Sequence, residues 1–185
     1  MTSQSTPSRL GIIVSSARPN RIADVVSQWV RESVPAEVTI DLIDLAEVAL
    51  PAFDGSAAPK SGVAPESDHH RAWAERIDAL DAAVIVTPQY NGSYPGALKN
   101  AIDYLYAEWS RLPVLLVGYG WMDASEVLAH LEPLMRRLDA DVVDAIGLGF
   151  GEDLSPQGEL SIRAEKAEAL TAGRAALRER LPVSV

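Results

Sequence analysis

The sequence predicts an α/β domain built on five parallel strands in the order 2-1-3-4-5, with helices on both faces of the sheet. Two observations support this architecture. Short apolar segments alternate with longer segments whose apolar residues recur at helical spacing, and turn-forming residues separate the segments. A repeated strand–helix order requires parallel strands joined by right-handed crossovers. In such a sheet the strand order reverses between the first and third strands, and ligands bind at that point.

The expected strands are short and mostly apolar, as strands buried on both faces are. They are expected at residues 10–14, 38–44, 82–86, 113–118 and 142–146. The expected helices show apolar residues at i, i+3, i+4 and i+7. They are expected at residues 22–30, 67–80, 95–105, 127–138 and 161–181. Residues 46–68 carry several prolines and glycines and are expected to be a long irregular segment, whereas Pro133 should kink the fourth helix.

The composition limits the class of protein. A chain of 185 residues, 48% hydrophobic and 23% charged, fits one globular domain, which we expect at residues 9–185 after a disordered stretch at 1–8. No apolar run approaches the ~20 residues that a membrane span requires. The absence of cysteine excludes disulfides, thiol catalysis and Cys-ligated zinc.

The net charge of −10 disfavours binding to nucleic acid and to anionic membrane surfaces. The N-terminal residues are polar, and the apolar run at residues 10–14 is too short for the core of a signal peptide. We therefore expect a cytoplasmic protein that has no nucleic-acid or membrane partner.

The most informative segment follows the expected third strand. Residues 88–103 read PQYNGSYPGALKNAID. The turn dipeptide Asn91-Gly92 permits positive φ angles, and Pro95 is suited to open a helix because its missing N–H would have no partner there. A buried strand thus leads into a rigid loop and the loop into a helix, at the edge where parallel sheets bind ligands.

A second candidate site follows the expected first strand, where residues 15–21 read SSARPNR. The next helix would offer free N–H groups and about half a positive charge at its N-terminus. The residues expected to line this site are Ser15, Ser16, Arg18, Asn20, Arg21 and Ile22. Hydroxyl and amide groups would add hydrogen bonds, and arginine can bind phosphate through two parallel bonds. The pattern predicts a phosphate cradle; the alternative is a helix cap with two solvated arginines.

These two segments resemble the NAD(P)H-dependent FMN reductases, flavodoxin-like enzymes that include quinone, azo-dye and chromate reductases. The resemblance covers sixteen consecutive positions at residues 88–103 and extends from the first strand to about residue 146. In the first loop, Ser16 and Arg18 match the family's Gly-Ser-x-Arg pattern, whereas Ser15 replaces the usual glycine. In the second loop, Gln89 stands where the family usually has glutamate.

The resemblance implies a flavodoxin-like fold and a bound FMN that carries the chemistry, so we expect no catalytic acid or base and no metal ligand. It also implies cofactor contacts from a second and a third loop. The residues expected to make them are Pro88, Gln89, Tyr90, Asn91, Gly92, Ser93, Gly118 and Gly120. The second loop has the alternative of a simple tight turn before a helix. The third loop is bulkier than is usual in the family because of Tyr119, Trp121 and Met122, and these side chains have the alternative of packing against a neighbouring segment.

The implied activity is two-electron, ping-pong transfer from NADPH or NADH to a small-molecule acceptor: a quinone, azo compound, flavin or metal ion. Because the family commonly forms dimers or tetramers, we expect a homodimer or homotetramer, with Tyr104, Tyr106 and Trp109 as a candidate contact surface. One alternative is a flavodoxin-type electron carrier without NAD(P)H turnover. Another is a hydrolase on the same frame, although the sequence lacks a nucleophile motif.

Three further pairs of residues receive structural interpretations. His69 and His70 are adjacent, so their side chains should diverge on a helix and form a surface pair rather than a metal site. Trp29 and Trp73 lie on apolar helical faces and are expected in the core. Lys99 and Asp103 are four residues apart and should pair on a helix surface.

Overall fold

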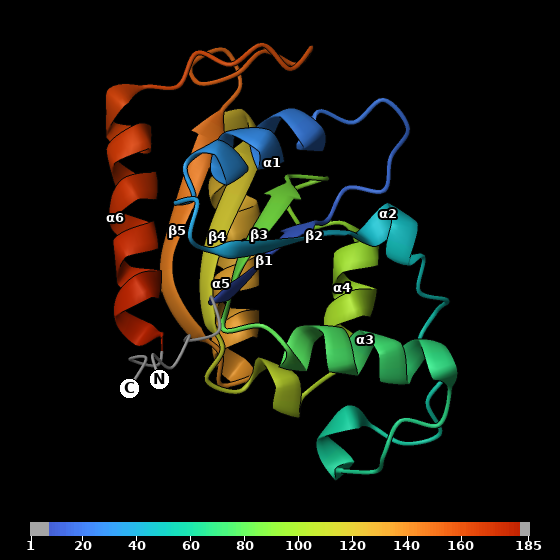
Figure 1. Cartoon of the computed structure of the whole chain (residues 1–185). Helices are drawn as coiled ribbons and strands as arrows, with labels where there is room; N and C mark the ends of the chain where they lie inside the picture. Colours follow the sequence, from blue (N-terminus) through green and yellow to red (C-terminus); the bar gives the residue numbers. More distant parts are fainter. Residues whose placement is uncertain (1–7, 182–185) are drawn as a thin grey trace, which may run out of the picture.

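The computed structural model describes residues 8–181, in which a parallel sheet lies between two layers of helices (Figure 1). Ser8 is the first described residue, and its carbonyl accepts a hydrogen bond from the Thr39 N–H at 2.9 Å. The rest of the stretch expected to be disordered, residues 1–7, lies outside the described residues. None of the helices in residues 8–181 combines the length and apolar character that crossing a membrane requires.

The sheet has the predicted topology. Its strands are β1 (Arg9–Val14), β2 (Thr39–Asp44), β3 (Ala82–Pro88), β4 (Pro113–Gly120) and β5 (Asp141–Gly149). All neighbouring strands are parallel, and their order is β2-β1-β3-β4-β5. The carboxyl ends of the strands therefore share one edge, where the loop between β1 and α1 also lies (Figure 1).

Five of the helices agree with the predicted positions to within a few residues, and α2 (Leu45–Val48) was not predicted. The five are α1 (Ala23–Glu32), α3 (Asp68–Asp78), α4 (Gly96–Asp103), α5 (Ser125–Arg137) and α6 (Ala164–Arg180). Short 3₁₀ turns are η1 (Pro59–Ser61), η2 (Ala107–Trp109) and η3 (Trp121–Ala124). The segment at residues 46–68 is thus less irregular than expected, because α2 and η1 lie partly or wholly within it. Pro133 lies inside α5.

The two faces of the sheet bury separate cores, which confirms helices on both faces. Helices α1 and α6 cover one face, and α3, α4 and α5 cover the other. Side chains alternate along β4: Leu116 packs in the core under α3–α5, whereas Val117 and Tyr119 pack in the core under α1 and α6. This alternation decides which residues at the end of β4 turn towards the loop after β1.

The prediction of a subunit contact surface in the segment after α4 is wrong for two of its three residues. Tyr104 and Trp109 are fully buried, and only Tyr106 is partly exposed. The Trp109 indole N–H donates to the Ile102 carbonyl at 3.2 Å, and the Tyr104 hydroxyl donates to the Pro51 carbonyl at 3.2 Å. The two side chains hold the 46–68 segment and η2 in place rather than offering an exposed face.

The histidine pair also differs from expectation. His70 is buried beside Phe53 and Tyr104, with ring centres 6.3 and 5.2 Å away, so a surface pair is wrong for this residue. His69 remains partly exposed and lies 3.1 Å from the Asp54 carboxylate. His70 is buried because Phe53, from the irregular segment after α2, packs against it beside Tyr104.

Two of the other local interpretations agree with the structure, and the third, for Trp29, holds in part. Trp73 is in the core and donates its indole N–H to the Ala101 carbonyl at 2.8 Å. Trp29 is partly buried and packs against the core under α1. Lys99 and Asp103 form the expected ion pair along α4.

Candidate functional site

The first and second loops meet at the carboxyl edge of the sheet, where β1 and β3 are neighbours. The Ser15 N–H donates to the Val86 carbonyl at 3.0 Å, so the first loop begins against the end of β3. The Ser16 hydroxyl then lies 2.8 Å from the Tyr90 hydroxyl, and either group can be the donor. Two segments more than 70 residues apart in the sequence therefore form one site.

Ser15 and Ser16 are both fully buried in this site. Within residues 8–181, the Ser15 hydroxyl finds no hydrogen-bond partner. Leaving a buried hydroxyl unpaired costs about 1–3 kcal/mol, so such groups are rare unless a ligand completes them. The unpaired Ser15 hydroxyl is the observation at this loop that most favours a polar ligand.

Arg18 is exposed at the outer edge of the same loop. Its guanidinium carbon lies 5.8 Å from the centre of the Tyr90 ring, a cation–π contact. Arg18 makes no salt bridge with any residue in the described part of the chain. Asn20 is also exposed and has a φ of 53°, which asparagine tolerates better than most residues. Arg18 is thus a positive charge available to an anionic ligand.

Arg21 has a different environment from Arg18. Its NH1 group donates to the Ser16 carbonyl and to Asp44 Oδ1, both at 2.7 Å, and its Nε donates to Asp24 at 3.0 Å. A second contact to Asp44 makes the pair bidentate. This pairing raises the pKa of Arg21 above its usual range and lowers the pKa of Asp44. Ile22, the next residue, is buried and packs in the core under α1.

The second loop has the tight turn that the sequence predicts. The Tyr90 N–H donates to the Ser93 carbonyl at 2.8 Å, and the Ser93 N–H donates to the Tyr90 carbonyl at 3.0 Å. Asn91 and Gly92 lie between them with φ angles of 49° and 77°. This confirms positive φ at both positions and gives the loop a fixed shape beside the first loop.

Gln89 connects the second loop to helix α5. Its side-chain N–H donates to the Glu126 carboxylate at 3.0 Å, and its side-chain oxygen accepts from the Val127 N–H at 3.3 Å. A glutamate at position 89 would lack the donor and would face a like charge at Glu126. The departure from the family's usual residue is therefore explained by a local neighbour. Pro88, the last residue of β3, is buried and lies opposite Tyr119 of β4.

The third segment differs from the expected loop because β4 continues to Gly120. A Cβ at Gly118 would lie 3.0 Å from Leu128, so this glycine makes room for α5. A Cβ at Gly120 would lie 2.8 Å from the Cβ of Gln89. Both glycines therefore permit close packing, and whether they also contact a cofactor stays a prediction.

Tyr119 is the side chain from this strand that turns towards the first loop. It is buried on the α1 side of the sheet, and this burial raises the pKa of its hydroxyl. Tyr90 also raises that pKa, whereas Ser16 and the positive charge of Arg18 lower it, and burial has the largest effect. The sequence placed Tyr119 among the bulky residues of a third loop, with packing against a neighbouring segment as the alternative. The alternation of side chains along β4, extended by two residues, is the signal that places it at the site.

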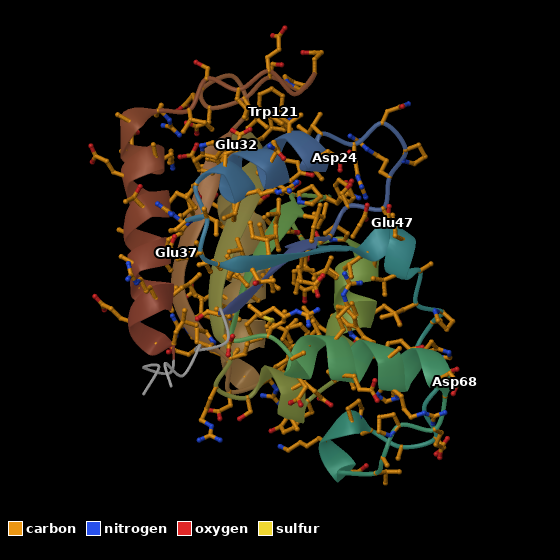
Figure 2. All side chains as sticks on the ribbon, in the orientation of Figure 1. Asp24, Glu32, Glu37, Glu47, Asp68 and Trp121 are labelled. Carbon is orange, nitrogen blue, oxygen red and sulfur yellow. The ribbon has the colours of Figure 1, made fainter. Side chains whose placement is uncertain are left out.

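The turn η3 follows β4 and presents two large apolar side chains to solvent. Trp121 is 62% exposed and Met122 is 66% exposed, and the Trp121 ring contacts Phe150 edge-on with centroids 5.4 Å apart. Figure 2 shows Trp121 near the loop that follows β5. Asp123 fixes the turn by accepting hydrogen bonds from Arg163 at 2.9 Å and from Lys166 at 2.8 Å. The alternative of packing against a neighbouring segment thus holds for the buried Tyr119 and only in part for Trp121.

Comparison with known proteins agrees with this geometry. Residues 8–154 match the family described as NADPH-dependent FMN reductase. The chain belongs to this family. The NAD(P)H-dependent FMN reductase LOT6 of Saccharomyces cerevisiae is 33% identical over 177 residues, which cover 85% of this chain and 92% of that protein. The FMN-dependent NADPH-azoreductase of Staphylococcus aureus is 32% identical over 130 residues, 69% of each chain.

A solved structure supports the fold. FerB of Paracoccus denitrificans, described as a flavoenzyme NAD(P)H:(acceptor) oxidoreductase, aligns with a TM-score of 0.68 at 21% identity, over 94% of this chain and 97% of that one. Membership in the NADPH-dependent FMN reductase family confirms the flavodoxin-like fold, the oxidoreductase class and the pairing of FMN with NAD(P)H.

The residues of the first loop fit the phosphate of FMN. The Ser15 hydroxyl is buried without a partner, Arg18 carries an exposed positive charge, and the N-terminus of α1 follows directly. Free N–H groups and the helix dipole at such an N-terminus favour an anion. The first loop lies at the switch point between β1 and β3, which is where the sequence predicted this loop.

Proposed function

We propose that the chain is an FMN-containing oxidoreductase that passes two electrons from NADPH or NADH to a quinone, azo compound, flavin or metal ion in ping-pong order. The observation that supports this most is the meeting of the two family loops around the buried Ser15 and Ser16 hydroxyls and the exposed Arg18. FMN, when bound, supplies the hydride chemistry.

The chain's own residues bind and orient the cofactor in this proposal. Ser15, Ser16 and Arg18, with the N-terminus of α1, would hold the phosphate. The turn at residues 90–93, which has a fixed shape, would border the ring. The first loop offers one phosphate site, so we expect FMN to be retained and FAD to be released. Reconstitution of the protein with each flavin, followed by gel filtration, tests this; equal or tighter retention of FAD would contradict it.

We expect ping-pong order because the nicotinamide and the acceptor would both need the same exposed face of the flavin ring. The nicotinamide and the acceptor would therefore bind in turn. Initial rates at several fixed quinone concentrations should give parallel lines in double-reciprocal plots against NADPH. Intersecting lines would contradict the shared face.

The alternative of an electron carrier makes a different prediction for the same assay. A flavodoxin-type carrier would bind FMN but would not oxidise NADPH or NADH in the presence of quinone. The names of the relatives, which are reductases and azoreductases, favour turnover. We also propose a cytoplasmic homodimer or homotetramer, whose contact surface lies away from the buried Tyr104 and Trp109; light scattering of the purified protein tests the oligomeric state.

A further inference from the structure

The guanidinium of Arg21 is surrounded by oxygen atoms of this chain. All three of its nitrogens donate hydrogen bonds: NH1 to Ser16 and Asp44, NH2 to Asp44, and Nε to Asp24. Only 15% of the Arg21 side chain and 14% of the Asp44 side chain are exposed. Two carboxylates more than cancel the single positive charge, so this group is poorly suited to attract a phosphate dianion.

Asp44 joins this pair to the rest of the fold. It is the last residue of β2 and lies opposite Val14, the last residue of β1. Its Oδ1 also accepts the Ala46 N–H at 2.8 Å, which caps the N-terminus of α2. The Arg21–Asp44 pair therefore links the loop after β1 to the end of β2 and the start of α2.

The contact from Arg21 to the Ser16 carbonyl acts on the loop itself. Ser16 is buried, and its hydroxyl meets Tyr90 of the second loop at 2.8 Å. Fixing the Ser16 carbonyl thus fixes the backbone that carries both buried serines and the side chain that meets the second loop.

We propose that Arg21 is a positioning residue, held by Asp44 to shape the phosphate loop, and that Arg18 alone of the two arginines meets the phosphate of the cofactor. The inference rests on the proposed binding of FMN. It divides between two residues a role that the sequence assigns to both.

One substitution distinguishes a positioning role of Arg21 from direct phosphate binding, because the two roles predict opposite changes in the affinity for FMN. If Arg21 bound phosphate, Asp44 would compete with the ligand for it, and Asp44→Asn would leave the affinity for FMN unchanged or increase it. If Arg21 is a positioning residue, Asp44→Asn removes its charged partner and loosens the loop, so the affinity falls. Asparagine caps helices about as well as aspartate, so the cap of α2 is kept in this variant.

The experiment measures dissociation constants of the apo-protein for FMN and for riboflavin by quenching of flavin fluorescence. We expect Asp44→Asn and Arg21→Ala each to weaken FMN binding about tenfold, and the double variant to be no weaker than Arg21→Ala. Binding of riboflavin, which lacks the phosphate, should change less than threefold. Arg21→Lys should restore part of the affinity, because it keeps the charge beside Asp44.

Asp41→Asn is the matched control. Asp41 lies in the same strand, its side chain is 12% exposed, and it pairs with Arg9 at 2.8 Å and Arg76 at 2.7 Å. Its loss should lower the melting temperature in the same way as the loss of Asp44 but leave the affinity for FMN unchanged.

Three results would overturn the inference: unchanged or tighter FMN binding by Asp44→Asn, an equal loss of affinity in Asp41→Asn, or an equal loss for riboflavin and FMN. The proposed enzymatic function fails separately. A parent protein that shows the expected pattern of flavin affinities but does not oxidise NADPH or NADH would support the role of Arg21 and contradict the reductase activity.

Discussion

Removing the side chain of Arg18 should weaken the binding of FMN while leaving the fold intact. Arg18 is exposed and its one described interaction is the contact with Tyr90, 5.8 Å from the ring centre. A charge-assisted contact with phosphate contributes about 1.5–3 kcal/mol. Giving up an exposed cation–π contact on binding costs about 0.5–1 kcal/mol, which leaves about 0.5–2.5 kcal/mol. Arg18→Ala should therefore raise the dissociation constant about two- to seventyfold.

The assay is a titration of apo-protein into FMN at two salt concentrations, followed by flavin fluorescence. The variant should show a weaker dependence on salt than the parent, because one ionic contact is missing. Loss of the contact with Tyr90 should lower the melting temperature of the apo-protein by no more than about 3 °C. Arg31→Ala, which removes another exposed positive charge near the far end of α1, is the control and should keep the parent affinity. An unchanged affinity in Arg18→Ala would mean that the phosphate binds elsewhere.

Three other substitutions test the account. Ser15→Ala removes an unpaired buried hydroxyl, so it should stabilise the apo-protein by about 1 kcal/mol in urea unfolding while weakening FMN binding. Gln89→Glu should lower the melting temperature through repulsion from Glu126, and adding Glu126→Gln should restore it. Burial opposes ionisation of Asp153, but Arg163 and two backbone N–H groups outweigh burial and hold its pKa at about 2. Because this pKa is below that of the unfolded chain, the stabilisation is present above about pH 4 and is lost as the pH falls towards 2; Asp153→Asn should reduce that pH dependence of unfolding.

The strands and their order could be predicted from the sequence, because each strand coincides with a short apolar segment. The prediction ended β4 and β5 too early, because both strands continue through glycines and, in β4, a tyrosine. A Cβ at Gly147 would lie 1.7 Å from the Asp123 carbonyl oxygen, so the glycine there is required by a close approach of η3. Such an approach is a tertiary contact, and no local pattern indicates it.

The sequence placed both candidate loops after the first and third strands, where they lie in the structure, but it did not predict the pairing of Arg21 with Asp44. The sequence shows two arginines in one loop, yet only the parallel pairing of β1 with β2 brings Asp44 beside Arg21. Register is set by the buried faces of the strands, so the pair could be found only after aligning Val14 with Asp44. The burial of His70 was missed for a similar reason, since Phe53 reaches it from an irregular segment with no periodicity.

In the proposed function, NAD(P)H reduces a flavin bound at this site, and a second substrate then reoxidises the flavin. The most direct test mixes FMN-loaded protein with excess NADPH or NADH in a stopped-flow instrument without oxygen, and then adds a quinone in a second mix. We predict a single phase in which the flavin absorbance near 450 nm bleaches by two electrons per FMN, followed by full return of the colour. Failure of both nicotinamides to bleach the flavin on the timescale of turnover would contradict the account and favour an electron carrier.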